Sequence, residues 1–458
     1  MRTRLLATAA VAAALSATLA GCGGTAGGGS SKSIKVIYWQ QLNSANKIQA
    51  NYLKTQAAAF EKANPGTSVQ LVPVTASEND FYTKIDLMMR APSTTPDLVY
   101  EDTATLNSDV ASGYLAPLDQ DLSSWSEWQK FAPAAKAAVR GTDGKTYAVP
   151  DETDTRGIWY NKQLFAKAGL PVPWQPKSWA DVLSAARAIK AKVPGAVPLN
   201  IYTGKAGGEA SSMQGLEMLL YGTPAGSNSL YDARTKKWVV GSQQFKDALQ
   251  FVKTVYSQGL GPTPSQALSA NFSNTISDDL LPSGKLAMDI DGSWMPQHWI
   301  ASGDKPWPQW SSTMATAPMP TQNGQAPGQV SMSGGWAWSI PAKARNSSLA
   351  WKFVQYLNTE QAATQWNVVN NTIAVRSDVA ADPKYLKSVP TNAFFTGLVK
   401  HTYYRPALPV YTQVSTAIQD AMESVTTGQS SVAAAASTYD SAVKAAVGAG
   451  NTETGGNP

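Results

Sequence analysis

The sequence predicts an α/β fold that is divided into two lobes. The chain has 458 residues, which is enough for two large lobes. In the first hundred residues, short β-rich runs alternate with helical patterns, and this order favours a largely parallel sheet. The rest of the chain holds long amphipathic helical patterns and few strands. The difference indicates a second lobe with more helix than the first.

The first lobe begins with three expected strands and two expected helices. Apolar and β-branched residues favour the strands, and helical spacing such as Ile48, Tyr52 and Phe60 favours the helices. Asn64-Pro65-Gly66 should end the first helix. The strands are expected at 34–39, 68–74 and 96–100, and the helices at 48–60 and 81–90.

The later helices are marked by capping and by apolar stripes. Ser178 and Asp181 form a capping box that opens a helix through Ile189. Apolar side chains three and four residues apart predict core-facing helices, and an Ala-rich run predicts one more. These further helices are expected at 245–256, 349–357, 414–425 and 432–447.

The N-terminus reads as an export signal. Arg2 and Arg4 precede an apolar run, Leu5 to Leu19, that is too short to span a membrane as a mature helix. Leu19-Ala20-Gly21-Cys22 resembles a bacterial lipobox, in which the cysteine is lipidated and becomes the new N-terminus. The alternative is a plain secretory peptide with an incidental cysteine. We therefore expect a signal peptide at 1–21, lipidation at Cys22, a flexible tether at 22–33 and membrane contact through the lipid anchor only.

Composition excludes several classes of protein. One Cys and two His cannot form an internal disulfide or an ordinary zinc site, so we expect no metal site and no cofactor. An oxygen-only site stays open, although no calcium-loop motif is present. The net charge is +5 without a long basic run, which argues against nucleic acid as a partner. No nucleophile-elbow or zinc-protease motif points to an enzyme.

Five segments in order carry a family resemblance. The first is one combined segment from Asp143 to Pro171, which begins with D-G-K-x-Y-x-V-P and continues from Asp154 with D-T-R-G-x-W-Y-N-K. Four later segments agree, at 284–294, 334–340, 350–353 and 405–415. Together they resemble the bacterial extracellular solute-binding proteins of carbohydrate ABC importers, the maltose-binding-protein-like family. The resemblance covers about residues 34 to 445.

The resemblance implies a two-lobed periplasmic-binding-protein-like fold with a hinge of several chain crossings. It also implies a binding protein without enzymatic activity or cofactor, expected to be a monomer, that closes around a di- or oligosaccharide and docks on an ABC permease. We place the N-terminal α/β lobe at 34–142 and 293–340, and the helix-rich C-terminal lobe at 143–292 and 341–447. The polar residues 448–458 are expected to be a disordered tail.

Candidate ligand contacts follow the strands of the first lobe. Ligands of open α/β sheets bind at the carboxyl ends of strands. The alternatives are lobe packing for Trp39 and helix capping for Asp80. The candidates from these strand ends are Trp39, Gln41, Asn43, Asp80, Glu101 and Asp102.

Further candidates come from segments that match the family. Asp154 and Arg156 could instead form an ion pair between the lobes. Trp336 and Trp338 are two residues apart in an expected strand and should share a face. The full set from these segments is Asp154, Arg156, Asp291, Trp294, Gly335, Trp336, Trp338, Tyr404 and Arg405.

The residue inventory suits a sugar. Flat aromatic rings match the C–H faces of a sugar, and charged or amide groups hydrogen-bond its hydroxyls. The chain has 15 Trp but only 15% charged residues. A polyamine or peptide is the alternative ligand. A secreted glycoside hydrolase that uses Glu101/Asp102 or Asp289/Asp291 is the alternative enzyme.

Overall fold

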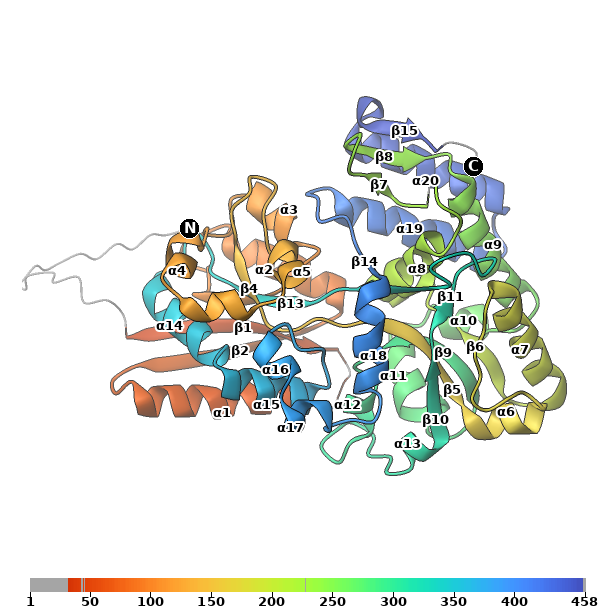
Figure 1. Ribbon diagram of the computed structural model, residues 1–458. Helices are drawn as coiled ribbons and strands as arrows, with labels where there is room; N and C mark the ends of the chain where they lie inside the picture. Colours follow the sequence, from red (N-terminus) through yellow and green to blue (C-terminus); the bar gives the residue numbers. More distant parts are fainter. Residues whose placement is uncertain (1–31, 43, 45, 227, 456–458) are drawn as a thin grey trace, which may run out of the picture. The chain divides into compact units, whose positions relative to one another are not determined.

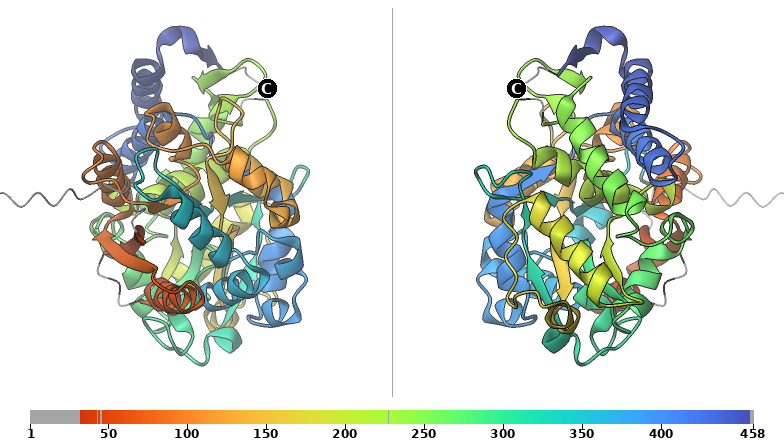
Figure 2. Two further views of the ribbon diagram at one scale, coloured as in Figure 1. Left: turned by 90° about the vertical axis from the view of Figure 1, so that its left-hand side faces the viewer. Right: turned by 90° about the vertical axis from the view of Figure 1, so that its right-hand side faces the viewer.

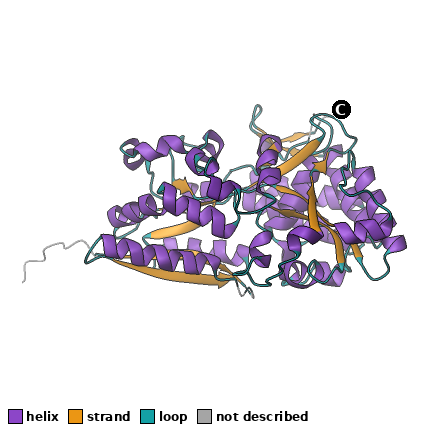
Figure 3. Ribbon diagram, turned by 60° about the horizontal axis from the view of Figure 1, so that its bottom comes forward, coloured by secondary structure: helices purple, strands orange, loops and turns teal. Residues whose placement is uncertain are grey.

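Two mixed β-sheets lie at the centres of two lobes in the computed structural model, which describes residues 32–42, 44, 46–226 and 228–455 (Figure 1). The N-terminal lobe contains a five-stranded sheet, and the C-terminal lobe contains a four-stranded sheet. Helices pack around the strands of each sheet (Figure 3). The α/β prediction is confirmed.

The N-terminal sheet has the strand order β2-β1-β3-β13-β4. Its parallel strands are β1 (Ser33–Gln41), β2 (Ser68–Ala76) and β3 (Leu98–Asp102), as the sequence predicts. Strand β13 (Trp336–Ser339) comes from much later in the chain and runs antiparallel to β3 and to β4 (Ala148–Pro150). The associated helices are α1 (Ile48–Ala63), α2 (Glu78–Met89), α14 (Ser347–Leu357) and α15 (Glu360–Asn370).

The C-terminal sheet has the order β10-β5-β9-β6. Its strands are β5 (Arg156–Asn161), β6 (Val197–Asn200), β9 (Leu286–Gly292) and β10 (Met314–Ala317). The capping box of Ser178 is present at the start of α7 (Trp179–Lys192). Helices α19 (Tyr411–Thr426) and α20 (Val432–Val447) lie beside α9 (Gln243–Ser257), blue beside green in Figure 2.

Short elements complete the fold. Two small sheets have the orders β11-β12-β14 and β15-β8-β7. Their strands are β7 (Tyr231–Asp232), β8 (Lys237–Val240), β11 (Met319–Pro320), β12 (Gln329–Ser333), β14 (Thr402–Tyr404) and β15 (Thr452–Thr454). The shorter helices are α3 (Leu106–Ala111), α4 (Asp119–Ser123), α5 (Pro133–Ala138), α6 (Lys162–Ala168), α8 (Met218–Tyr221), α10 (Pro264–Ala267), α11 (Phe272–Thr275), α12 (Pro296–Trp299), α13 (Trp310–Thr313), α16 (Ser377–Ala380), α17 (Pro383–Leu386) and α18 (Asn392–Leu398). The short 3-10 and π helices are η1 (Ser126–Lys130), η2 (Lys205–Gly207), η3 (Ser211–Glu217), η4 (Ile276–Leu280), η5 (Val399–His401) and η6 (Ala449–Asn451).

The chain passes between the lobes at several places, as expected. It leaves the N-terminal sheet after β4, returns between β12 and β13, and leaves again between α17 and α18. The first two crossing segments are hydrogen-bonded to each other, and to the loop between α15 and α16, around Thr153. The Thr153 hydroxyl donates to the Gly334 carbonyl of the second crossing at 2.8 Å, and its amide donates to the Ile373 carbonyl of that loop at 3.0 Å. These bonds hold the first two crossings together.

The observed lobe limits correct the expected ones. Residues 293–340 were assigned to the N-terminal lobe, but β10 pairs with β5 in the C-terminal sheet, and only β13 joins the N-terminal sheet. Residues 341–447 were assigned to the C-terminal lobe, but the apolar faces of α14 and α15 pack in the N-terminal core. Strand β4 also belongs to the N-terminal sheet, beyond the expected boundary at 142. The reason is pairing: β13 brings the chain back to β3, and the next helices cover that sheet.

The C-terminal segment is another correction. Residues 448–458 were expected to be disordered, but β15 pairs in parallel with β8, from Thr452 opposite Trp238 to Thr454 opposite Val240. The edge of β8 supplies backbone partners that override the polar composition of the segment. Cys22 and most of the expected tether lie outside the described residues. None of the helices in the described ranges has both the length and the apolar character needed to cross a membrane.

Candidate functional site

A cavity of about 650 Å³ is lined by residues of both lobes. This volume lies within the range of small-molecule sites in proteins. The N-terminal lobe contributes the end of β1, the start of α2, the end of β3 and the start of β13. The C-terminal lobe contributes the start of β5, the end of β9 and the segment 205–214. The carboxyl ends of β1 and β3 thus open on the cavity, as the sequence predicts.

Most of the candidate residues line this cavity. Those that do are Trp39, Gln41, Asp80, Asp102, Asp154, Arg156, Asp291, Trp294, Gly335, Trp336 and Arg405. Asn43 and Cys22 lie outside the described residues. Three candidates are placed elsewhere, namely Glu101, Trp338 and Tyr404.

These three placements correct the expectation. Glu101 is fully buried because it points to the face of β3 opposite that of Asp102. Trp338 does contact Tyr100, as Trp336 does, but it lies one step further into the sheet and is buried in the core. Tyr404 lies in β14, beside β12, and is not part of the cavity lining.

The N-terminal side of the cavity holds a group of aromatic rings. Trp336 is stacked with Trp39, with ring centroids 5.5 Å apart, and with Tyr100, with centroids 5.2 Å apart. The Trp39 indole donates to the Ala76 carbonyl at 3.0 Å. Part of the Trp336 ring surface is therefore covered by protein, which limits the area that a ligand can contact.

Trp294 forms the aromatic surface on the C-terminal side. The guanidinium carbon of Arg156 lies 4.8 Å from the centroid of its ring. Gly292 lies directly beneath the indole, because a Cβ atom at this position would be 2.0 Å from the ring. Trp294 is half-buried and lines the cavity. A glycine two residues before the tryptophan is thus a steric requirement for this ring position.

Arg156 is held by several bonds. It forms an ion pair with Asp154, donates from Nε to Gln214 at 2.8 Å, and donates from Nη1 to the Met332 carbonyl at 3.2 Å. Asp154 also accepts from the Gly334 amide at 2.8 Å, beside the crossing segments. Asp154 and Arg156 thus pair with each other within one segment and not across the lobes, and both still line the cavity.

Arg405 joins the two lobes. Its Nη2 donates to Asp102 of β3, and its Nη1 donates to Glu209 of the C-terminal lobe at 2.9 Å. Asp102 also accepts from the Tyr82 hydroxyl at 2.7 Å, and Glu209 accepts from Ser415. The Arg405 side chain is 4% exposed, so this is a buried, shared ion pair. A second contact between the lobes joins Gln41 to Asn274 at 2.8 Å.

Several carboxyl groups of the cavity have raised pKa values. Burial raises the pKa of Glu78 to about 7, with the charges of Asp102 and Glu209 adding to the effect. Burial also raises the pKa of Glu152 to about 8 and that of Asp291 to about 6. Glu152 accepts from Asn370 at 2.9 Å, and Asp291 accepts from the Tyr202 hydroxyl at 2.8 Å. These groups exchange protons near neutral pH.

Asp80 is the most weakly fixed of the candidates. It lies in the first turn of α2, where its amide donates to Ser77, the N-cap residue. Its own side chain is exposed at the cavity edge. The capping alternative thus applies to Ser77, and Asp80 is available to solvent or ligand.

Sequence reasoning missed several cavity residues. Tyr100 stands next to a candidate on β3, and strand alternation could have found it. Glu152 lies in the first crossing, close to the motif at Asp154. Glu209 follows a glycine-rich turn and has no local signal at all. The missed polar or aromatic lining residues include Glu78, Tyr100, Glu152, Tyr202, Glu209, Gln214 and Asn274.

The fold and the cavity define a two-lobed binding protein with its ligand site between the lobes. Residues 44–364 match the family described as bacterial extracellular solute-binding protein. The chain belongs to this family.

Individual relatives agree with this assignment. The galactooligosaccharide-binding protein of Bacillus subtilis (strain 168) is 24% identical over 427 residues, covering 91% of each chain. The GacH receptor of Streptomyces glaucescens, solved unliganded and with acarbose, is 25% identical with a TM-score of 0.76, covering 92% of this chain and 99% of that one. Maltose-bound MalE3 of Thermotoga maritima has a TM-score of 0.74 at 20% identity, covering 90% and 99%, and supports the fold alone. These relatives are binding proteins.

Proposed function

We propose that the chain binds a di- or oligosaccharide in the interlobe cavity and delivers it to an ABC permease. The observation that carries this proposal is the combination of aromatic rings and fixed polar groups on opposite sides of one cavity. Trp336 and Trp39 lie on the N-terminal side, and Trp294 lies on the C-terminal side. A sugar that contacts both sides favours the closed form through its differential affinity. The sugar ligands of the B. subtilis and S. glaucescens relatives support the same class of ligand.

The polar groups suit hydroxyl recognition. Arg156 and Arg405 already have carboxylate partners, so their remaining donors and the partner oxygens are fixed in place. Fixed donors and acceptors bind neutral hydroxyl groups without adding net charge. A phosphate ester would need free cations, and both arginines are already paired. This argues for an uncharged polyol over an anion.

A cationic ligand is the second candidate. Carboxyl groups outnumber cations in the lining, which holds Glu78, Asp80, Asp102, Glu152, Asp154, Glu209 and Asp291 against Arg156, Lys205 and Arg405. An amine-bearing sugar or a polyamine would add a positive charge to this setting. Calorimetry with neutral oligosaccharides, an amino-sugar oligomer and a polyamine distinguishes the two.

A hydrolytic role has less support. The two proposed carboxylate pairs each have one member outside the cavity, since Glu101 and Asp289 are fully buried and do not line it. A glycosidase needs both carboxyl groups at the bound sugar. We propose binding without catalysis, and release of smaller sugars by purified protein would contradict this.

The anchor is proposed from the sequence. Lipidation at Cys22 would hold the binding protein, as a monomer, on the outer face of the cell membrane near its permease. Cys22→Ala should move the protein from the membrane fraction into the medium. If both forms partition alike, the lipid anchor is wrong.

The central test is ligand affinity of a Trp294→Ala variant. Loss of this ring should weaken sugar binding by about 2 kcal/mol, or roughly thirtyfold in Kd, because a central tryptophan is a typical hot spot. Trp307→Ala is the matched control, since Trp307 is also half-buried and packs in the same cluster but does not line the cavity. Titration calorimetry over maltose-, xylose-, galactose- and cellobiose-type oligosaccharides measures both variants. No binding of any sugar by the native chain would reject the proposal.

A further inference from the structure

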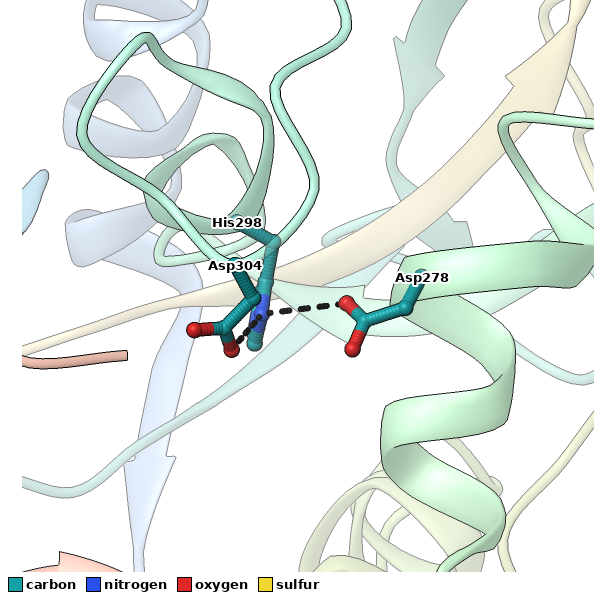
Figure 4. Close-up of side chains that lie close together, drawn as sticks. All are labelled: Asp278, His298 and Asp304. Atoms are coloured by element: carbon teal, nitrogen blue, oxygen red, sulfur yellow. Dashed lines mark hydrogen bonds and ion pairs between the residues drawn. The ribbon is translucent and has the colours of Figure 1, made fainter. Parts of the chain in front are cut away.

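Three ligating side chains converge beside the cavity, as Figure 4 shows. They are Asp278 of η4, His298 of α12 and Asp304 of the loop that follows α12. His298 Nδ1 lies 3.3 Å from Asp304 Oδ2 and 3.7 Å from Asp278 Oδ1. One ligand atom from each residue lies within 4.8 Å of the other two. Both carboxylates thus face the same ring nitrogen.

This group brings two carboxylates together, one of them buried and the other 32% exposed. The side chain of Asp304 is 2% exposed and that of His298 is 8% exposed. Within the described part of the chain, no lysine or arginine forms an ion pair with either carboxylate. Asp304 Oδ1 is buried without any hydrogen-bond partner among the described residues. A buried carboxylate without a cation, such as that of Asp304, is costly, and a metal cation between Asp304 and Asp278 would offset this cost.

Hydroxyl groups support the oxygen atoms that face the imidazole. Ser277 Oγ donates to Asp278 Oδ1 at 2.9 Å, and Ser44 Oγ donates to Asp304 Oδ2 at 2.9 Å. Hydrogen bonds of this kind orient the ligands of metal sites and are part of their affinity. Ser44 belongs to the N-terminal lobe, so one of these bonds crosses between the lobes.

We propose that Asp278, His298 and Asp304 bind a divalent transition metal ion such as Zn²⁺. Bonds of about 2.0–2.2 Å from zinc to nitrogen and oxygen place tetrahedral ligand atoms roughly 3.3–3.5 Å apart. The two separations from His298 Nδ1, 3.3 and 3.7 Å, match this geometry after small side-chain shifts. One nitrogen and two carboxylate oxygens leave a fourth position open for water. The charge of the ion balances the two carboxylates.

The site lies at the cavity wall, since Ser44, Ser277 and His298 also line the cavity. The proposal does not depend on the nature of the sugar. It adds a metal to a chain whose cysteine and histidine counts gave no sign of one. Ligands at positions 278, 298 and 304 follow no metal-binding motif, and only the fold brings them together.

The test is metal binding by the full-length exported chain after chelator treatment and dialysis. Titration calorimetry with Zn²⁺ should give one tight equivalent per chain, weaker at pH 5 than at pH 7 because the ligands must lose protons. Co²⁺ should give the visible absorption of a tetrahedral nitrogen–oxygen site. His298→Ala and Asp278→Asn should each weaken Zn²⁺ binding by at least about 100-fold, and Ser277→Ala by about 10-fold.

Asp279→Asn and His401→Ala are the matched controls. Asp279 is the neighbour of Asp278 on η4 and pairs with exposed Lys285, and His401 is the other histidine of the chain. Both controls should bind Zn²⁺ like the native chain. The proposal is overturned if the native chain binds no equivalent of Zn²⁺, or if His298→Ala and Asp278→Asn, shown to be folded by circular dichroism, keep native affinity and native Co²⁺ absorption.

Discussion

Two neighbouring carboxyl groups of strand β3 lie on opposite faces of the strand, in different environments. Asp102 faces the cavity, where Arg405 and the Tyr82 hydroxyl bind it. Glu101, the preceding residue, faces the lobe interior, and neither of its carboxyl oxygens has a hydrogen-bond partner among the described residues. Its neighbours there include Asp86 of α2 and Asp109 of α3, which are also acids.

The comparison shows two ways in which the fold accommodates a buried acid: pairing with a cation, or protonation. On the cavity side, a cation from the other lobe offsets the carboxylate charge. On the interior side, neither Glu101 nor Asp109 forms an ion pair with a lysine or arginine among the described residues, and burial favours their protonated forms. Burial raises the pKa of Glu101 well above its usual range, and burial together with the charge of Glu101 raises that of Asp109 to about 11. The carboxyl group on the cavity side is thus paired with a cation, whereas burial on the interior side favours the neutral acids.

The largest effect is expected from removing the cation of the cavity side. Arg405→Ala leaves Asp102 and Glu209 buried without the cation that pairs with both. Breaking a buried pair in this way costs about 3–5 kcal/mol of the free energy of unfolding. Urea unfolding measures the loss. Arg405→Ala should also weaken sugar binding, because the contact joins the two lobes.

Lys205→Ala is the control for this change. Lys205 pairs with Asp420 at 2.8 Å, but both side chains are at least half exposed. Its removal should cost less than about 1 kcal/mol. Equal losses for the two variants would mean that Arg405 is not acting as a buried partner.

The next effect concerns the interior acids and pH. A carboxyl group with a raised folded pKa keeps a proton that the unfolded chain releases, so stability falls as pH rises from about 4, the unfolded value, towards the folded pKa. Each such group contributes a slope of up to about 1.4 kcal/mol per pH unit. Glu101→Gln should therefore make the fall in unfolding free energy between pH 5 and pH 8 less steep.

The comparison variant for the pH experiment is Asp80→Asn, an exposed carboxyl of the same lobe. Its stability should follow the native pH dependence. Parallel curves for Glu101→Gln and the native chain would show that the interior acids do not titrate differently in the folded and unfolded chains.

The smallest expected effect is on ligand affinity alone. Gly292→Ala puts a methyl group 2.0 Å from the Trp294 ring, so the half-buried indole must shift. Sugar binding should weaken by about tenfold, or roughly 1.4 kcal/mol. Glu101→Gln should leave sugar affinity unchanged, because Glu101 does not line the cavity. Calorimetry measures the sugar affinity of both variants. A native affinity for Gly292→Ala would contradict the role of Trp294 in sugar binding.

The helices and strands that local patterns predicted are present in the structure. Strands β1 to β3, the Ser178 capping box and the stripe helices α9, α14 and α19 lie where apolar spacing placed them. Lobe membership could not be read in this way, because β13 joins β3 across more than two hundred residues. For the same reason the C-terminal segment was predicted as disordered, although β8 provides its edge for pairing.

In the candidate site, too, local patterns predicted some features and tertiary contacts decided the others. The sequence by itself determined that polar and aromatic residues follow the strand ends, and it selected Trp294, Arg156 and Arg405 from family motifs. Only the tertiary structure decided that Asp102 faces the cavity while Glu101 is buried, since strand alternation gives opposite faces without saying which one is inside. It also decided the partner of Arg405 and the meeting of Asp278, His298 and Asp304. These contacts join residues distant in sequence, and local propensity carries no information about them.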